Sequence, residues 1–219
     1  MPAQRRSRPA KWTAAAFTLV ELLVVLAIIS ILASLLMSGV TKARDKAKQI
    51  SCMNNLKQLS TAILMYAQEH EDRLPPLWGA LGDNWWDMTS PYMGKQVTSL
   101  DERNQIKIFK CPAELYLTGG SKGPVYAMNN ALKDTALSNA SHYEGCALSE
   151  IKNAASTMLA GDGFYNSTWG NSSSILSSIS DGVNTGISYR HMKGANFSFI
   201  DGHVSWQEQP APSSLLTKQ

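Results

Sequence analysis

The chain has 219 residues and a formal net charge of +3, and charged residues make up 17% of it. Four basic residues, Arg5, Arg6, Arg8 and Lys11, precede residue 17, and the rest of the chain carries 16 basic against 17 acidic residues. This balance argues against a nucleic-acid-binding protein, which needs a basic surface. The length allows one ordinary domain beside the apolar segment near the start, and the abundance of small polar residues is typical of a β-rich exported domain.

The first predicted element is a helix of membrane length, Phe17–Met37, in which Glu21 is the single charged residue. At a rise of about 1.5 Å per residue this helix spans roughly 30 Å, the thickness of a bilayer's hydrocarbon core. A carboxylate in such a segment costs about 2.5–3.5 kcal/mol on insertion. We therefore expect Glu21 to have a partner and a function.

Two simpler interpretations of this segment are incomplete. A secretory signal peptide would have a shorter apolar core, followed by small residues two positions apart. A plain membrane anchor accounts for the length but not for Glu21. The positive-inside rule assigns no orientation, because the basic residues before the segment are balanced by those after it, Lys42, Arg44, Lys46 and Lys48.

Residues 16–37, A-FTLVELLVVLAIISILASLLM, resemble the N-terminal processing motif of type IV prepilins and type II secretion pseudopilins. The resemblance implies that residues 1–16 are a basic leader. A prepilin peptidase would cut between Ala16 and Phe17 and then methylate the new amine, which makes Glu21 the fifth residue of the mature chain. The family prefers Gly before the cut, so Ala16 predicts slower cleavage.

Cleavage would also create a partner for Glu21. In a filament, the amine of Phe17 in one subunit can neutralise Glu21 of its neighbour within a low-dielectric helix bundle. An unpaired carboxylate is costly there, whereas a paired one fixes the axial register. We expect Glu21 to be an assembly determinant.

The helical pattern continues through residues 41–70. Apolar residues recur there at steps of three and four, which predicts an amphipathic stem with one face packed on a sheet. This stripe consists of Ala43, Ala47, Ile50, Met53, Leu56, Leu59, Ile63 and Tyr66. One helix is thus predicted from about Phe17 to about Glu69, with Pro75 and Pro76 as a stop. The stretch Cys52–Pro76 also resembles the same neighbourhood in a large pseudopilin-like family of environmental bacteria.

Residues 71–219 are predicted to form a β-rich head. Ile106–Cys111, 125–128 and Thr157–Ala160 read as strands, and Asn166–Ser180 reads as a surface loop. An aromatic-rich loop over residues 77–105 either covers the end of a small core or binds a sugar. Its aromatic residues include Trp78, Trp85, Trp86 and Tyr92.

The chain has three cysteines and no CxxC pair, which argues against a zinc-ribbon or thioredoxin-type site. An odd number in an exported domain permits one disulfide and one thiol. We expect a disulfide between Cys52 of the stem and Cys111 at the end of a strand packed on it, with Cys146 as the thiol. Three thiols are the alternative.

The C-terminal segment predicts a β-hairpin. Asp201-Gly202 is a strong signal for a two-residue type I′ turn, which would pair Phe199 with Val204 and Phe197 with Trp206. These four paired residues would form one apolar face, which we expect to cover the stem helix.

The same segment resembles the H-x9-DG motif found at the end of many prepilin-processed proteins. His191 is followed by nine residues and then by Asp201 and Gly202. The two resemblances, at opposite ends of one chain, imply one family.

A metal site is a weaker expectation. Two histidines and two carboxylates suit zinc or a harder ion: Asp162, His191, Asp201 and His203. The turn already accounts for Asp201, and His203 is expected on the polar face of the hairpin. Calcium stabilises the heads of some pseudopilins, so the resemblance also allows a calcium ion held by Asp162 or Asp181.

Catalysis has little support. The sequence contains no GxSxG, HExxH or phosphate-loop motif. His142 and Cys146 lie four residues apart, but no group nearby would orient the histidine. We expect no enzymatic activity and no cofactor.

The sequence therefore predicts an α+β, pilin-like fold. It comprises a leader (1–16), a transmembrane or filament-core helix (17–40), an amphipathic stem (41–70) and a head with a small antiparallel sheet (71–219). The expected protein is a single-pass bacterial inner-membrane precursor with its head exported to the periplasm or cell surface. Its expected partners are a prepilin peptidase and the other subunits of a pilus or pseudopilus filament. The alternative is a membrane-anchored domain that binds a ligand or carbohydrate.

Overall fold

The computed structural model describes residues 18–77, 84–97, 102, 106–113, 126–137, 144–163, 175–176 and 186–217. The chain divides into two compact units, Met1–Ala43 and Arg44–Gln219. The expected leader and the cleavage site at Ala16 and Phe17 lie outside the described residues, as do Trp78, His142 and Asp181.

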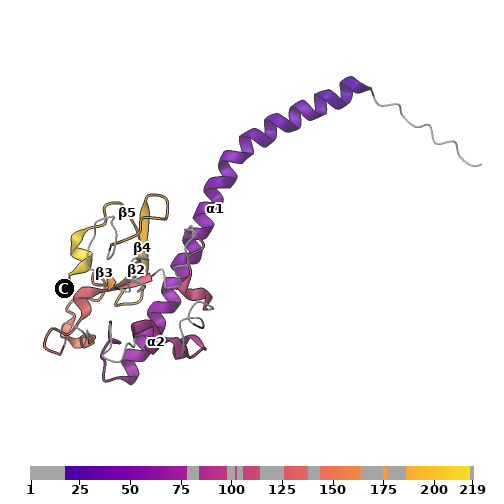
Figure 1. The fold of residues 1–219 in the computed structure, drawn as a ribbon. Helices are drawn as coiled ribbons and strands as arrows, with labels where there is room; N and C mark the ends of the chain where they lie inside the picture. The colour runs from indigo at the N-terminus through magenta and orange to yellow at the C-terminus, as the bar shows by residue number, and fades with distance from the viewer. Residues whose placement is uncertain are drawn as a thin grey trace, which may run out of the picture. The chain divides into compact units, whose positions relative to one another are not determined.

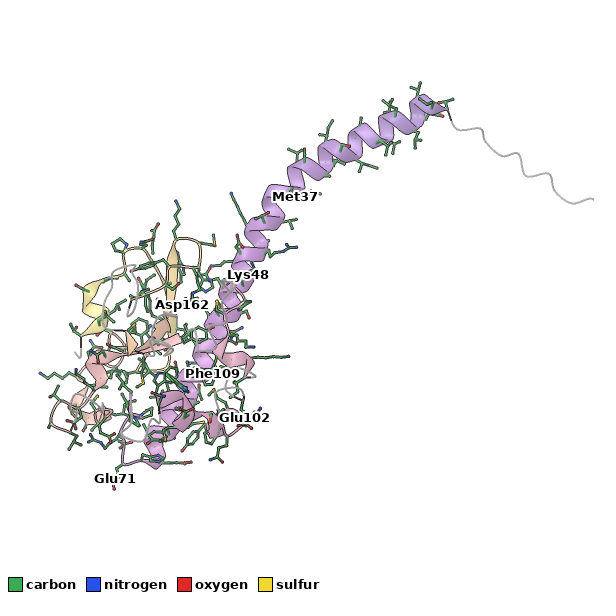
Figure 2. All side chains as sticks on the ribbon, in the orientation of Figure 1. Met37, Lys48, Glu71, Glu102, Phe109 and Asp162 are labelled. Carbon is green, nitrogen blue, oxygen red and sulfur yellow. A yellow bond between two sulfur atoms is a disulfide. The ribbon has the colours of Figure 1, made fainter. Side chains whose placement is uncertain are left out.

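Helix α1 extends over Leu19–Glu69 and has 51 residues (Figure 1). It begins and ends close to the predicted positions. In its first stretch, residues 19–40, every described side chain is exposed, and apolar side chains point outward around the whole helix (Figure 2). By length and composition, α1 is the one helix in the described part of the chain that could cross a membrane.

The second stretch of α1, residues 49–67, has one buried face. Its members lie three or four residues apart: Gln49, Cys52, Leu56, Leu59, Ile63 and Ala67. The predicted stripe is wrong at its start, because Ala43, Ala47 and Ile50 are exposed. Each residue advances the helix by about 100°, so a step of three residues falls about 60° short of a full turn. The two steps from Ile50 to Met53 and from Met53 to Leu56 therefore place Ile50 roughly 120° away from Leu56 around the helix.

The head contains a five-stranded sheet in the order β3-β1-β2-β4-β5. The strands are β1 (Tyr126–Asn129), β2 (Met158–Asp162), β3 (Ile175–Leu176), β4 (Gly194–Phe199) and β5 (Val204–Glu208). Antiparallel pairing joins β1 to β2, β2 to β4 and β4 to β5. The predicted α+β class and small antiparallel sheet are thus confirmed, with the short β3 added in parallel to β1.

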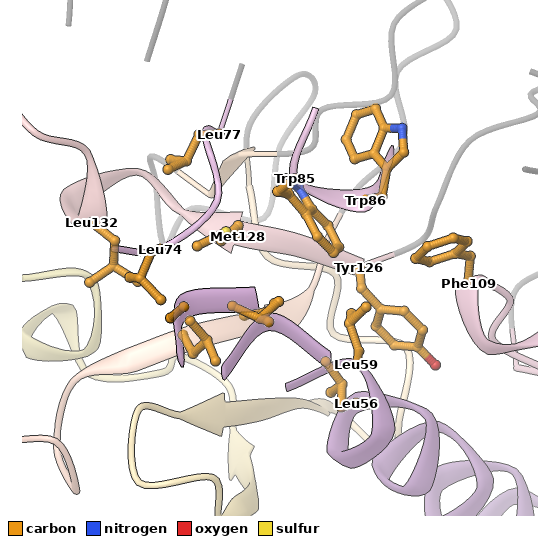
Figure 3. Close-up of a cluster of buried hydrophobic side chains, with 14 of the residues drawn as sticks. Leu56, Leu59, Leu74, Leu77, Trp85, Trp86, Phe109, Tyr126, Met128 and Leu132 are labelled. Atoms are coloured by element: carbon orange, nitrogen blue, oxygen red, sulfur yellow. The ribbon is translucent and has the colours of Figure 1, made fainter. Parts of the chain in front are cut away.

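Both faces of this sheet are covered. The larger core lies between the sheet and α1 and includes Leu56, Leu59, Trp85, Tyr126 and Met128 (Figure 3). The smaller core lies on the other face and is closed by the C-terminal segment. Its larger buried residues are Met158, Ile187, Phe197, Phe199 and Leu215. The burial of all six residues of β4 follows from this arrangement.

The predicted register of the β4–β5 hairpin is wrong by one residue. Ser198 pairs with Val204 and Asn196 with Trp206, because the loop contains three residues rather than two. Gly202 is the loop residue with a positive φ, +83°. A shift of one residue moves every side chain to the other face. Phe197 therefore faces the smaller core, and Asn196 and Ser198 lie on the face toward α1.

Contacts outside the hairpin account for the longer loop. The N–H of Ile200 donates to the carbonyl of Thr157 at 3.1 Å, and the N–H of Asp201 donates to that of Ala154 at 3.3 Å. The hairpin closes instead through the N–H of Phe199, which donates to the carbonyl of His203 at 3.0 Å.

Two local predictions in the head are also wrong. The segment expected as a strand over residues 106–111 contains a 3₁₀ turn, η2 (Lys107–Phe109). Of its three buried residues, Ile106 and Phe109 lie three apart, the spacing of a turn rather than a strand, and Cys111 follows the turn. The segment expected as a loop over residues 166–180 contributes strand β3, and its other residues lie outside the described ranges.

Candidate functional site

The start of α1 forms a capping box between Thr18 and Glu21. The backbone N–H and the hydroxyl of Thr18 each donate to Oε2 of Glu21 at 2.8 Å. In return, the N–H of Glu21 donates to Oγ1 of Thr18 at 3.3 Å. The pattern Thr-x-x-Glu is the sequence signature of this motif. Glu21 therefore has a local hydrogen-bond partner, and its negative charge lies at the helix end where the dipole favours it.

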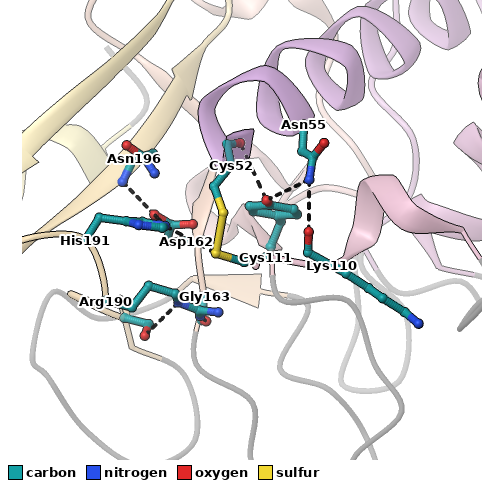
Figure 4. Close-up of a disulfide and its surroundings, with 11 residues drawn as sticks. Cys52, Asn55, Lys110, Cys111, Asp162, Gly163, Arg190, His191 and Asn196 are labelled. Carbon is teal, nitrogen blue, oxygen red and sulfur yellow. Dashed lines mark hydrogen bonds and ion pairs between the residues drawn. A yellow bond between two sulfur atoms is a disulfide. The ribbon is translucent and has the colours of Figure 1, made fainter. Parts of the chain in front are cut away.

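A second cluster of polar residues lies inside the head, beside the disulfide between Cys52 and Cys111 (Figure 4). This is the expected pair, and their Cα atoms are 5.4 Å apart. The bond joins α1 to the segment after η2 and closes a chain separation of 59 residues. Cys146 is buried and takes no part in a disulfide.

His191 lies against this disulfide. Its Nε2 atom is 3.3 Å from Sγ of Cys111 and 3.5 Å from Oδ2 of Asp162. His191 is 2% exposed and Asp162 is fully buried. Oδ2 of Asp162 also accepts the backbone N–H of Asn196 at 2.7 Å. The cluster thus joins α1, the end of β2, the start of β4 and the turn before β4.

Burial decides the charge state of His191. The pKa of the imidazole is lowered from 6.5 to about 4, mainly because the charged form loses its hydration and also because the guanidinium of Arg190 is nearby. The ring is therefore neutral at pH 7. Among the residues that the structure describes, Nδ1 of His191 has no hydrogen-bond partner.

A two-residue turn places His191. The N–H of His191 donates to the carbonyl of Gly194 at 3.0 Å, and the N–H of Gly194 donates back at 2.9 Å. Met192 and Lys193 between them both have positive φ, 52° and 63°. Side chains with a Cβ rarely adopt this conformation, so the turn carries backbone strain beside the cluster.

The two ends of the H-x9-DG motif meet the same helix. His191 lies within 4.8 Å of the Cys52 and Cys111 sulfurs, measured between ligand atoms. At the other end, Nζ of Lys57 donates to the carbonyl of Gly202 at 2.5 Å. The two ends of the motif therefore lie before and after β4. One end contacts the disulfide and the other contacts Lys57, and these two contacts hold the hairpin on the stem.

The metal candidates separate into two pairs. Asp162 and His191 are buried together, whereas His203 is exposed and its Nδ1 lies 2.6 Å from Oδ1 of Asp201. The expectation of one site for all four residues is wrong, because the hairpin loop carries Asp201 and His203 to the surface. The structure instead places Cys52 and Cys111 beside His191. From the sequence, the two cysteines were expected only as a disulfide, and His191 as a residue of the H-x9-DG motif and a metal candidate.

A pocket of about 320 Å³ opens beside this cluster. Its lining includes Asp45 and Lys48 of α1, Arg190, His191 and Met192. Met192 is 53% exposed, so the pocket connects the surface with the buried imidazole.

In the aromatic-rich loop over residues 77–105, for which core cover and sugar binding were the two interpretations, both described tryptophans belong to the core. Trp85 is fully buried and Trp86 is 2% exposed. The ring of Trp85 meets that of Phe109 edge-on, with the centroids 6.3 Å apart. Tyr92 donates its hydroxyl to Glu69 at 2.6 Å, which raises the pKa of Tyr92 to about 12. Trp85 and Trp86 therefore present no open ring face on which a sugar could stack.

Two family models match the chain. One, described as a prokaryotic N-terminal methylation motif, matches residues 13–37, and the other, described as a protein of unknown function (DUF1559), matches residues 41–104. No curated protein and no solved structure gives a significant match. The methylation motif covers the expected cut and the apolar stretch of α1, and the second match begins where the stem begins. Over these residues the chain is similar to type IV prepilin-like proteins.

Proposed function

We propose that this chain is a structural subunit of a type IV pilus-like or type II secretion pseudopilus filament, with no catalytic activity of its own. It is made as a single-pass inner-membrane precursor, cut before Phe17 by a prepilin peptidase and methylated on the new amine. The head is exported to the periplasm or cell surface. The observation that carries the proposal is the first stretch of α1, whose apolar side chains are exposed all round and whose single carboxylate is Glu21.

The chemistry of assembly follows from the capping box. Oε2 of Glu21 accepts both hydrogen bonds from Thr18, and the carboxylate projects at the start of the helix. Two carboxylate oxygens offer about four acceptor sites, so Glu21 can keep Thr18 and also accept an amine from a neighbouring subunit. The capping box holds the carboxylate in one orientation before that amine arrives, which lowers the entropy lost on docking.

The first test is the mature N-terminus, measured by mass spectrometry on protein from its native membrane. A start at N-methyl-Phe17 supports prepilin processing. A start at Met1 or Pro2 contradicts it and leaves a membrane-anchored domain that binds a ligand.

The second test is Glu21→Gln, with the exposed Glu208→Gln as the matched control. Breaking one side of a buried ion pair costs about 3–5 kcal/mol, so we expect processed Glu21→Gln chains to remain in the membrane as unassembled subunits. Sheared filaments are quantified against the membrane-bound pool. Normal filament yield from Glu21→Gln would remove Glu21 from the assembly mechanism.

A further inference from the structure

Three metal-ligand side chains converge in the buried cluster of the head, and a fourth lies next to one of them. Cys52, Cys111 and His191 have their ligand atoms within 4.8 Å of one another, and all three residues are buried. Asp162 adds a fully buried carboxylate oxygen on the Nε2 side of His191. Two sulfurs, one imidazole nitrogen and one carboxylate oxygen form a ligand set that suits zinc.

Two of the separations match a tetrahedral ion. With Zn–S near 2.3 Å and Zn–N and Zn–O near 2.1 Å, tetrahedral ligands lie about 3.6 Å apart for sulfur and nitrogen and about 3.4 Å apart for nitrogen and oxygen. The structure gives 3.3 Å from Sγ of Cys111 to Nε2 of His191, and 3.5 Å from Nε2 to Oδ2 of Asp162. The imidazole is therefore already at ligand distance from both neighbours, whereas the two sulfurs have to separate and Asp162, which lies outside the group within 4.8 Å of one another, has to approach them.

The surroundings also suit a metal. The N–H of Asn196 holds Oδ2 of Asp162 in place at 2.7 Å, as an outer-shell group does for a ligating carboxylate. The pocket of about 320 Å³ that His191 lines provides a route from solvent.

We propose that reduction of the Cys52–Cys111 disulfide converts this cluster into a tetrahedral zinc site, with Cys52, Cys111, His191 and Asp162 as ligands. A dithiol reductant breaks the S–S bond, becomes a disulfide itself and leaves one hydrogen on each cysteine. Zinc binding then releases those two protons to solvent. The imidazole binds through Nε2 and keeps its single proton on Nδ1. The stem and the head are thus joined either by a covalent bond or by a metal ion.

This exchange does not depend on filament assembly, because all four ligands belong to one chain. The disulfide form and the zinc form exclude each other, since each sulfur can make the S–S bond or bind the ion as a thiolate. Zinc should therefore slow reoxidation of the reduced chain.

The test uses the full chain in detergent, reduced with a water-soluble phosphine, freed of excess reductant and titrated with Co²⁺ as a probe. We expect one Co²⁺ per reduced chain, with the intense visible absorption of a tetrahedral cobalt thiolate, and no uptake by the oxidised chain. Zn²⁺ should displace the cobalt. Peptide mapping after alkylation should show that the metal protects Cys52 and Cys111 but not Cys146.

Two variants identify the remaining ligands. His191→Ala and Asp162→Asn should each weaken Co²⁺ binding by at least about tenfold. His203→Ala is the matched control, because it removes an exposed imidazole that also lies beside an aspartate, and it should bind as tightly as the native chain. The protection measurement needs no variant, so misfolding of a variant does not obscure the result. The proposal is overturned if the reduced native chain binds no cobalt, or binds it equally well without His191.

Discussion

The two stretches of helix α1 have opposite environments. In residues 19–40 every described side chain is exposed, although most are large and apolar. In residues 49–67 a side chain is buried at every third or fourth position, and Cys52 is joined covalently to the rest of the head. The backbone is the same continuous helix throughout.

The comparison shows that helix formation and helix burial are separate properties of this sequence. The stem receives its apolar partners from its own chain, so truncating its side chains should destabilise the head. The first stretch has no such partners among the described residues, and its length and composition suit a bilayer. Substitutions there should change membrane or subunit contacts and leave the unfolding of the head unchanged.

The largest effect is expected from removing the disulfide that fixes the stem. A link that closes 59 residues contributes about 4 kcal/mol through the entropy of the unfolded chain. Cys52→Ala with Cys111→Ala should lower the free energy of unfolding by this amount, measured by urea titration in metal-free buffer. Cys146→Ala, which truncates a buried thiol outside the disulfide, should cost only about 1 kcal/mol. Equal losses in the two variants would mean that packing, and not the crosslink, stabilises the head.

A pair of leucines tests the comparison most directly. Leu59 is fully buried, whereas Leu32 is 55% exposed. Leu59→Ala should lower the free energy of unfolding of the head by about 3 kcal/mol through lost transfer energy and a cavity. Leu32→Ala should leave it within about 0.5 kcal/mol of the native value. The fluorescence of the buried Trp85 and Trp86 reports the transition. A similar loss for Leu32→Ala would show that the first stretch does stabilise the head.

The pH dependence of stability should depend on His191, which packs against the disulfide of the stem. The pKa of its ring is about 4 when folded and near 6.5 when unfolded, so the unfolded chain binds more protons between these values. Stability is then highest above pH 6.5 and falls as the pH drops toward 4. From pH 7 to pH 5 the expected loss is about 2 kcal/mol. Urea titrations at several pH values measure it.

The control for this effect is a substitution of His203, which forms an exposed pair with Asp201 on the hairpin loop. His191→Gln should flatten the pH profile between pH 5 and pH 7, whereas His203→Gln should keep the native slope. If both variants keep the slope, the dependence belongs to other groups and His191 is not held neutral by burial.

The smallest change in the free energy of unfolding is expected at Lys57, an exposed residue of the stem that is hydrogen-bonded to the hairpin loop. Lys57→Met keeps the aliphatic chain but removes the hydrogen bond to the carbonyl of Gly202. We expect a loss of about 1 kcal/mol in the free energy of unfolding. The exposed Lys107→Met serves as the control and should change the stability little. Faster amide exchange around Asp201 and Gly202 in Lys57→Met alone would place the effect at the loop.

Periodicity predicted the parts of the fold that depend on local sequence. The continuous pattern before Pro75 gave α1 nearly its observed ends, and the predicted strand residues 125–128 and 157–160 overlap β1 and β2. The capping box of Thr18 and Glu21 was also visible in the sequence, as a Thr-x-x-Glu pattern. We read Glu21 only as a membrane charge and missed this local role.

Features that depend on contacts between residues far apart in the sequence could not be predicted from local patterns. The register of the hairpin follows from hydrogen bonds to Thr157 and Ala154, which no turn signal encodes. The sequence grouped Asp162 with His191 as metal candidates, but their approach to each other depends on how β2 aligns with β4, which no local pattern gives. The sequence therefore did not show that this pair lies beside the Cys52–Cys111 disulfide.

The Cys52–Cys111 bond also determines how the molecule responds to a pulling force. Tension applied at Leu19 and at the C-terminal segment would run along the backbone of α1 to Cys52 and cross directly to Cys111. The intervening 59-residue separation, which at 3.3–3.6 Å per residue is about 200 Å of extended chain, would carry no load until the bond is cut. Leu56, Leu59 and the two buried tryptophans lie inside this unloaded loop, so the part of the larger core that α1 and residues 85–86 contribute is mechanically bypassed.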